Sequence, residues 1–118
     1  MHPHLKTVRG IDELDELLAM SSRQPVLLFK HSHTCGISAE ALDELVAHLH
    51  ERVPGVHYAV VTVQTHRDVC NEVTRKLGVR HETPQALLIR GGRVVWAASH
   101  FRVTAEAMQR AISERANA

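Results

Sequence analysis

One cysteine stands where an apolar run of the chain gives way to an amphipathic segment, and a serine follows three residues later. The run 26–29 (Val-Leu-Leu-Phe) precedes Cys35, and the amphipathic segment begins near Ile37. If a buried strand ends and a helix begins here, unpaired backbone N–H groups and the positive end of the helix dipole meet at the sulfur and favour a thiolate. A thiolate is the species that attacks disulfides. We therefore predict that Cys35 is a nucleophile.

Ser38 decides what happens after such an attack. Because an alcohol cannot form a disulfide, an adduct on Cys35 cannot close onto a neighbour in the same Cys-x-x-Ser motif and must wait for another thiol molecule. We expect the Ser38 hydroxyl to donate a hydrogen bond to the thiolate or the adduct, with backbone N–H groups of residues 36–38 as further donors.

The elements that must position these residues follow from apolar spacing. Alternating or unbroken apolar runs predict strands, and apolar stripes of helical period predict helices. Gly91-Gly92 predicts a hairpin turn, Gly78 a helix C-cap and Thr104 a helix N-cap. The predicted order is strand 5–8, helix 11–20, strand 26–30, helix 37–52, strand 57–63, helix 68–77, strands 85–89 and 94–98, and a closing helix after residue 104. Short, right-handed connections turn this order into a mixed central sheet with helices on both faces.

This order is similar to that of thioredoxin-like proteins, and a second local feature supports the resemblance. Thr83-Pro84 stands directly before the hairpin strand, where thioredoxin-like proteins carry a cis-proline that faces the active cysteine. The resemblance implies an α/β fold of three layers, α/β/α, that closes with a β-hairpin and a helix. It also implies that the Thr83 backbone pairs with an extended peptide or thiol adduct docked over Cys35.

At finer detail the chain resembles the YtxJ family, small thioredoxin-like proteins linked to the bacillithiol redox system. Three separated blocks carry this resemblance and cover nearly the whole chain: 29–32 (Phe-Lys-His-Ser) ahead of Cys35-x-Ile37-Ser38, 78–85 (Gly-Val-Arg-His-Glu-Thr-Pro-Gln) with 87–89, and 95–100 (Val-Trp-Ala-Ala-Ser-His). Two residues depart from the family pattern, since Gly36 stands where the family favours proline and Cys70 where it favours another residue.

The resemblance implies a monothiol bacilliredoxin-like oxidoreductase. Such a protein removes a low-molecular-weight thiol, bacillithiol in this family, from mixed disulfides on thiol-modified client proteins. No cofactor is expected to be bound, and the small thiol serves as co-substrate. The residues assigned to the site are catalytic Cys35 and Ser38, with Thr34, Gly36, Ile37, His81, Thr83 and Pro84 as the substrate-binding set.

Two alternatives remain open from the sequence. In the first, the groove between Cys35 and Thr83-Pro84 binds a thiol or client peptide without turnover. In the second, His31, His33 and Cys35 alternate on an extended backbone and bind zinc or copper, with His81 as a possible fourth ligand. Since the ten histidines are scattered along the chain, ordinary exposed or hydrogen-bonded imidazoles are the leading expectation and no metal is predicted.

His81 and Cys70 receive separate predictions. His81 precedes the proline, so we expect an imidazolium there to favour the thiolate, or an imidazole to transfer a proton to the departing thiol. Glu82 is expected to point to solvent. Cys70 shares an apolar helix face with Val73 and Leu77, which predicts burial across the sheet from Cys35 and no disulfide between the two cysteines.

Composition bounds the remaining possibilities. A chain of 118 residues suits one domain, 1–118, and its formal charge of +1 with no block of like charge argues against nucleic acid or a membrane surface as partners. The first 20 residues lack the apolar core of a signal peptide, and no apolar stretch is long enough to span a membrane. We therefore expect a cytoplasmic, reducing location, in which both cysteines are thiols.

Overall fold

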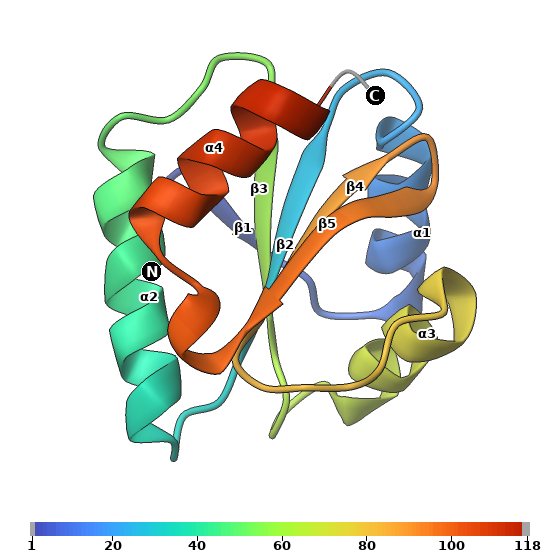
Figure 1. The fold of residues 1–118 in the computed structure, drawn as a ribbon. Coiled ribbons are helices and arrows are strands. Elements are labelled where there is room, and N and C mark those ends of the chain that lie inside the picture. The colour runs from blue at the N-terminus through green and yellow to red at the C-terminus, as the bar shows by residue number, and fades with distance from the viewer. Residues whose placement is uncertain (1, 117–118) are drawn as a thin grey trace.

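The computed structural model describes residues 2–116 and contains five strands, four α-helices and one short 3₁₀ helix. Their order is the one predicted from apolar spacing, except for the 3₁₀ helix, which the sequence did not indicate (Figure 1). The elements are β1 (Leu5–Thr7), α1 (Ile11–Met20), β2 (Val26–His31), α2 (Gly36–Leu49), β3 (His57–Thr62), α3 (Arg67–Leu77), β4 (Gln85–Arg90), β5 (Arg93–Ser99), η1 (His100–Arg102) and α4 (Ala105–Arg115).

One boundary differs noticeably from the prediction. Helix α2 ends at Leu49 rather than near residue 52. Beyond it the amides of Glu51 and Arg52 bond back only three residues, to His48 and Leu49, which tightens the chain into turns. Pro54 follows and cannot continue a helix, so the connection to β3 begins early.

The strands form a mixed sheet in the order β1-β3-β2-β4-β5. Strands β1, β3 and β2 run parallel, β4 runs antiparallel to β2, and β5 runs antiparallel to β4. All six residues of the central strand β2 are buried, as expected for a strand covered on both faces. Strand β5 forms one edge of the sheet.

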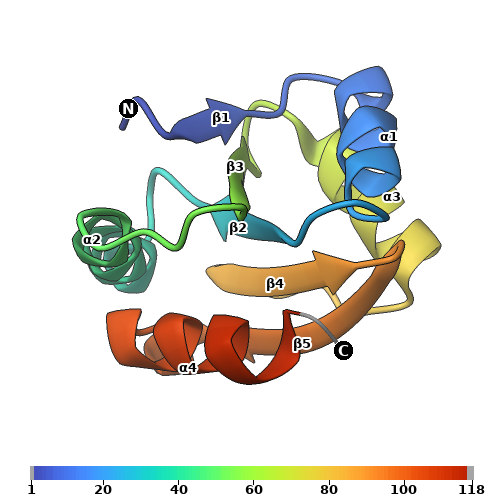
Figure 2. The same ribbon diagram turned by 90° about the horizontal axis from the view of Figure 1, so that it is seen from above.

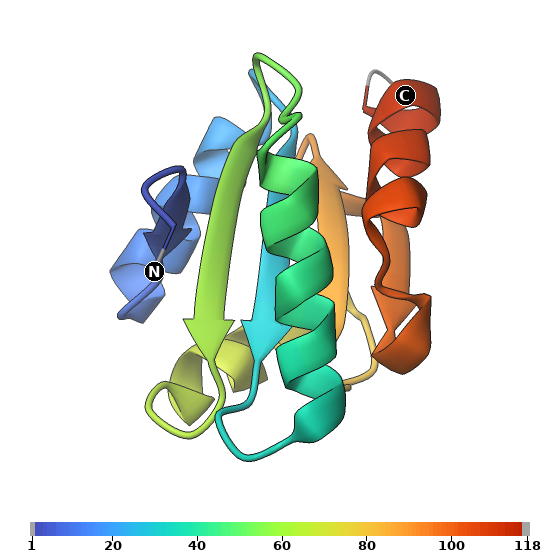
Figure 3. The same ribbon diagram turned by 90° about the vertical axis from the view of Figure 1, so that its left-hand side faces the viewer.

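Helices cover both faces of this sheet, which is the three-layer arrangement predicted from the sequence. Helices α2 and α4 lie on one face and α1 and α3 on the other (Figures 2 and 3). The first core contains Phe29, Leu45 and Met108, and the second contains Leu28 and Cys70. The predicted burial of Cys70, across the sheet from α2, is confirmed.

Several predicted local features are present. Gly78 ends α3 with a left-handed φ of 67°, and the Thr104 side chain accepts a hydrogen bond of 3.1 Å from the Ala107 amide at the start of α4. Gly91 and Gly92 form the hairpin turn with φ values of 62° and 73°. The Thr83-Pro84 peptide bond is cis. Within residues 2–116 no helix is both long and apolar enough to cross a membrane.

The topology explains why distant residues meet at one edge of the sheet. Strand β2 leads into the loop that carries Cys35, and its residue Lys30 pairs with Gln85, the first residue of antiparallel β4. The end of β2 therefore lies beside the start of β4. Because Thr83 and Pro84 directly precede β4, they lie next to the loop that leads to Cys35.

Candidate functional site

Cys35 occupies the N-cap position of α2, as the sequence predicts. Its backbone is extended, with φ −110° and ψ 122°, and its carbonyl accepts the first helical hydrogen bond from the Ala39 amide at 3.1 Å. The thiol is partly exposed and forms no disulfide. Within residues 2–116, the amides of residues 36–38 have no hydrogen-bond partner. They are thus available to a negative charge on the sulfur or on a bound adduct.

Gln64, which was not among the residues predicted to form the site, holds the loop before Cys35. The Gln64 Oε1 atom accepts from the His33 amide at 3.1 Å, and its Nε2 donates to Ser32 Oγ at 2.7 Å and Thr34 Oγ1 at 3.2 Å. Gln64 follows β3, which runs parallel to β2, so both strands end at the same edge of the sheet. Strand parallelism was the only sequence signal that could have indicated this contact.

Ser38 is fully buried and bonds to the loop and to β2. Its Oγ accepts from the Ser32 amide at 2.9 Å and lies 2.9 Å from His31 Nδ1. This differs from the expected donation to Cys35, since no hydrogen bond between the two side chains is formed within residues 2–116. The Ser38 hydroxyl can donate its proton toward Cys35 only when His31 is protonated on Nδ1. In that tautomer the His31 N–H donates to Ser38 Oγ, and the hydroxyl proton is not used in this bond.

The His31 ring is 7% exposed, and burial holds its pKa below the ordinary value of 6.5, with the neighbouring His33 lowering it further. His48, bonded to the Tyr58 hydroxyl at 2.8 Å, also has a pKa lowered by burial, although Glu51 opposes the shift. Both rings are therefore neutral in the folded protein near neutral pH.

These two histidines predict loss of stability in mild acid. Between the lowered folded pKa values and 6.5, the unfolded chain binds more protons than the folded protein, so the free energy of unfolding falls as the pH falls through this window. Urea unfolding at about pH 7.5 and about pH 5.5 measures the loss. His48→Gln, which keeps a side-chain hydrogen-bonding group but cannot be protonated, should lose less stability between the two pH values. An equal loss in both proteins contradicts this assignment.

The Thr83-Pro84 segment, which directly precedes β4, offers an unpaired backbone edge. Within residues 2–116, neither the amide nor the carbonyl of Thr83 has a hydrogen-bond partner, and Thr83 is half-buried. Pro84 is buried, and its carbonyl accepts from the His100 amide at 2.9 Å. An extended chain laid along Thr83 can satisfy both of its backbone groups.

A buried polar chain fixes this segment in place. Lys30 is fully buried, and its Nζ donates to Gln85 Oε1 at 2.9 Å, while Gln85 Nε2 donates to the Arg80 carbonyl at 3.1 Å. Burial lowers the pKa of Lys30, and the nearby Cys70 and Glu82 oppose the shift. The lysine thereby ties the end of β2 to the loop that carries Thr83 and Pro84. In the sequence, Lys30 stands out only as a charged residue at the end of an apolar run.

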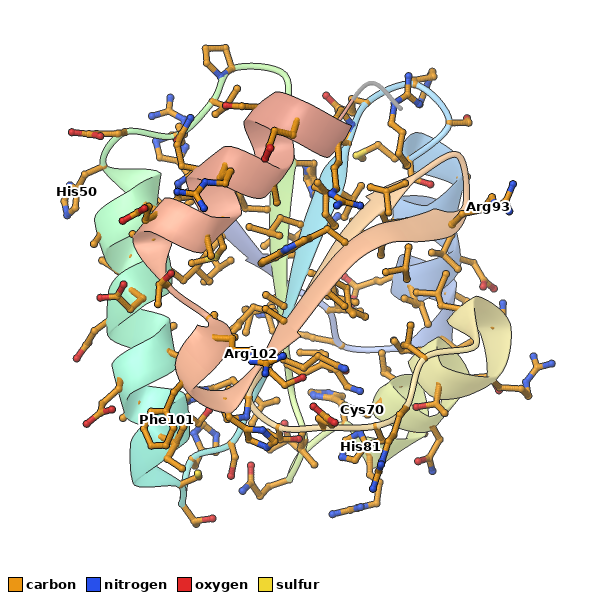
Figure 4. The ribbon with its side chains drawn as sticks, viewed as in Figure 1. His50, Cys70, His81, Arg93, Phe101 and Arg102 are labelled. Atoms are coloured by element: carbon orange, nitrogen blue, oxygen red, sulfur yellow. The ribbon has the colours of Figure 1, made fainter. Side chains whose placement is uncertain are left out.

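Of the two roles expected for His81, stabilisation of the thiolate by an imidazolium is disfavoured. Partial burial lowers its pKa, and the positive charges of Lys30 and Arg67 lower it further, so the neutral imidazole is favoured over an imidazolium. Its Nε2 lies 3.3 Å from Thr83 Oγ1. Figure 4 shows His81 on the α3 side of the site, whereas Phe101 lies beside α2. A neutral ring can still transfer a proton to a departing thiolate if it first accepts one, as when the Cys35 thiol ionises.

The alternative metal site is not assembled. Within residues 2–116, no three histidine, cysteine, aspartate or glutamate side chains are arranged to hold a metal ion. The rings of His31 and His33 meet edge to face with centroids 5.5 Å apart, and His31 Nδ1 is bonded to Ser38. Cys70 is 1% exposed, and burial raises the pKa of its thiol despite the opposing charges of Lys30 and Arg67.

Comparisons with known proteins identify the family and the fold of the chain. A family model described as Monothiol bacilliredoxin BrxC matches residues 6–108. Among solved structures, the chain is similar to a protein described as a candidate oxidoreductase with a thioredoxin fold, with 30% identity, coverage of 92% of this chain and 93% of that chain, and a TM-score of 0.81.

More distant structures are thioredoxins. A Fasciola hepatica thioredoxin is 16% identical, with coverage of 92% of this chain and 97% of that chain and a TM-score of 0.74. A Nicotiana alata thioredoxin is 14% identical, with coverage of 98% of this chain and 96% of that chain and a TM-score of 0.75. At these identities the likeness shows the fold alone. The thioredoxin-like fold predicted from the sequence is confirmed.

Proposed function

The chain belongs to the monothiol bacilliredoxin family, a family of thiol–disulfide redox proteins, and from this premise we propose that Cys35 removes bacillithiol from mixed disulfides on client proteins. The observation that carries the proposal is the contrast between the two cysteines of the chain. Cys35 is partly exposed beside three unpaired helix amides, whereas Cys70 lies in the core. An adduct therefore has one accessible sulfur on which to form.

The reaction proceeds in two balanced exchanges. In the first, the Cys35 thiolate attacks the bacillithiol sulfur of the mixed disulfide, the client sulfur leaves as a thiolate and takes a proton, and Cys35 carries the bacillithiol. In the second, a free bacillithiol thiolate attacks the bacillithiol sulfur of that adduct, which forms bacillithiol disulfide and regenerates the Cys35 thiolate. The client is reduced, and two bacillithiol molecules are oxidised to one disulfide.

The neighbouring residues are proposed to position these reactants. The amides of residues 36–38 donate to the thiolate, and the Thr83 backbone pairs with the docked client or adduct beside Pro84. His81, neutral before the reaction, accepts the proton that the Cys35 thiol loses and, as an imidazolium, donates it to the departing client thiolate. Ser38 holds the loop by accepting a hydrogen bond from the Ser32 amide. Because Ser38 has a hydroxyl in place of a thiol, a second bacillithiol molecule is needed to release the adduct.

The remaining assignments are part of the same proposal. Bacillithiol is a co-substrate and no cofactor is bound. The clients are proteins with bacillithiol-modified cysteines, and neither nucleic acid nor a membrane is a partner. A reducing cytoplasm is the compartment in which the Cys35 thiol persists.

A burst experiment tests the proposal. A client that carries bacillithiol is mixed with a smaller amount of the protein, and the recovery of client thiol is followed with and without free bacillithiol. Without free thiol we expect one client molecule released per molecule of protein, because the Cys35 adduct has no resolving cysteine. With free bacillithiol we expect repeated turnover.

A second outcome favours the alternative function. If client release does not exceed the uncatalysed rate under either condition while the modified client still binds, the protein is a thiol-binding or peptide-binding module and the proposal is wrong. A burst of two client molecules per protein also contradicts it, because this requires a second reactive sulfur.

A further inference from the structure

A hollow in the surface adjoins the Thr83-Pro84 segment on the side of β5. Its volume is about 620 Å³, and it lies between the loop before β4 and the end of β5 with η1. Glu82 and Gln85, which flank Thr83-Pro84, both line it. The polar residues around its walls also include Arg80, Ser99, His100 and Arg102.

The charges of this hollow are mixed and incompletely paired. Arg80 and Arg102 are exposed, and within residues 2–116 neither guanidinium forms a hydrogen bond or an ion pair. Glu82, which we expected from the sequence to point to solvent, is half-buried and lines this open hollow. A hydrogen bond from the Ser99 side chain holds the pKa of Glu82 below its ordinary value, with His100, Arg80 and Lys30 acting in the same direction. The hollow thus presents two cations and one carboxylate.

The hollow is connected to the surroundings of Cys35 through η1. The His100 amide donates to the Pro84 carbonyl at 2.9 Å, which joins η1 to the Thr83-Pro84 segment. His100 and Phe101 also line a neighbouring hollow of about 370 Å³ whose other wall includes Ile37, two residues after Cys35. The hollow that contains Arg80 and Arg102 therefore lies at the same edge of the fold as a molecule bound covalently to Cys35.

The backbone at this junction is unusual. His100 has a left-handed φ of 56°, which is uncommon for a residue with a side chain. The turn directs Phe101 outward with 70% exposure, between the two hollows. In Figure 4, Phe101 lies beside α2, Arg102 lies to its right over β5, and Arg93 lies at the opposite end of β5.

We propose that this hollow recognises the low-molecular-weight half of the mixed disulfide, and that its ligand class is a zwitterionic thiol that carries carboxylates and an ammonium group. Arg80 and Arg102 bind the carboxylates, because a guanidinium can bond a carboxylate through two parallel N–H groups. Glu82, next to Thr83, binds the ammonium group. This inference rests on the proposed function, since it names the residues that select the small thiol in that reaction.

Binding without exchange provides the first test. S-methylglutathione has two carboxylates and an ammonium group but no reactive sulfur, and its affinity is measured by NMR titration of Cys35→Ser protein. We expect Arg80→Gln with Arg102→Gln to weaken the affinity about tenfold or more, and Arg93→Gln, at the far end of β5, to leave it unchanged. Equal affinity in these two proteins, or no binding to either, overturns the proposal even if Cys35 exchanges thiols.

Exchange kinetics provide the second test. One client is modified with mercaptosuccinate, which has only carboxylates, with cysteamine, which has only an ammonium group, or with neutral mercaptoethanol. We expect the double arginine variant to lower kcat/KM for the mercaptosuccinate adduct about tenfold through KM, and Glu82→Gln to lower it for the cysteamine adduct. The mercaptoethanol adduct should be unaffected in both variants. A uniform loss of kcat/KM for all three adducts in the variants overturns the proposal. If the unaltered protein is inactive on all three adducts, the proposed function is refuted, and the binding test alone decides whether the hollow recognises the small thiol.

Discussion

The Cys35→Ser substitution is expected to lower the rate at which the small thiol is released from a modified client by about a thousandfold or more, to the uncatalysed rate. A serine hydroxyl at the N-cap of α2 is not ionised near neutral pH and cannot form the mixed disulfide on which both exchanges depend. The measurement is client thiol recovered per unit time under multiple turnover with free bacillithiol. Serine is close to cysteine in size and is favoured at N-caps, so the variant should fold.

Cys70→Ala is the matched control for this loss. Cys70 lies in the core between α3 and the sheet, and its replacement removes one buried sulfur at a cost of about 1 kcal/mol or more in the free energy of unfolding. Its rate of client release should equal that of the unaltered chain. A folded Cys70→Ala protein that loses release as completely as Cys35→Ser would show that the reaction uses both sulfurs, contrary to the monothiol assignment.

Ser38→Cys is expected to change the order of the reaction. Residues three apart in the first turn of a helix lie on the same face, which is the spacing of dithiol Cys-x-x-Cys motifs. The thiolate introduced at position 38 can attack Cys35 in the adduct, so that the small thiol leaves as a free thiol and an internal disulfide joins the two positions. Without free bacillithiol, the unaltered protein should retain the small thiol and the variant should release it. Intact-mass spectrometry measures the difference.

Ser38→Ala is the control for the hydrogen bonds of the serine hydroxyl that the cysteine substitution also removes. The alanine leaves the Ser32 amide and His31 Nδ1 without their partner, at a cost of about 1–3 kcal/mol in stability, but adds no sulfur. It should retain the small thiol as the unaltered protein does. If Ser38→Cys retains the adduct as fully as Ser38→Ala, a thiol at position 38 cannot reach Cys35 and the assigned geometry of the motif is wrong.

Features that depend on neighbouring residues in the sequence were predictable. Apolar runs and stripes determine which segments become strands and helices, and the cap residues Gly78 and Thr104 act within one turn of their own helices. Cys35 was identified in the same way, because a strand and a helix that meet at one residue leave amides unpaired there. The approach of Thr83-Pro84 needed the fold resemblance as well, since that proximity depends on the pairing of β2 with β4.

Side-chain contacts and pKa shifts that depend on residues distant in the sequence were not predictable. Gln64 reaches the loop before Cys35 only because β3 and β2 end together, and His31 bonds Ser38 only because the start of α2 folds back over the end of β2. The neutral state of His81 follows from its partial burial and from Lys30 and Arg67, which lie far from it in sequence. The left-handed His100 and the exposed Phe101 had no sequence signal, because a histidine followed by a phenylalanine after a strand is equally compatible with a continued strand.

The monothiol mechanism is tested most directly by locating the adduct after a single turnover. The protein is mixed with an equal amount of bacillithiol-modified client in the absence of free thiol, quenched with acid, digested without reducing agent and mapped by mass spectrometry. A monothiol reaction at Cys35 leaves bacillithiol on the peptide that contains Cys35 and leaves Cys70 unmodified. Client release with bacillithiol on Cys70, or on neither cysteine, would contradict it.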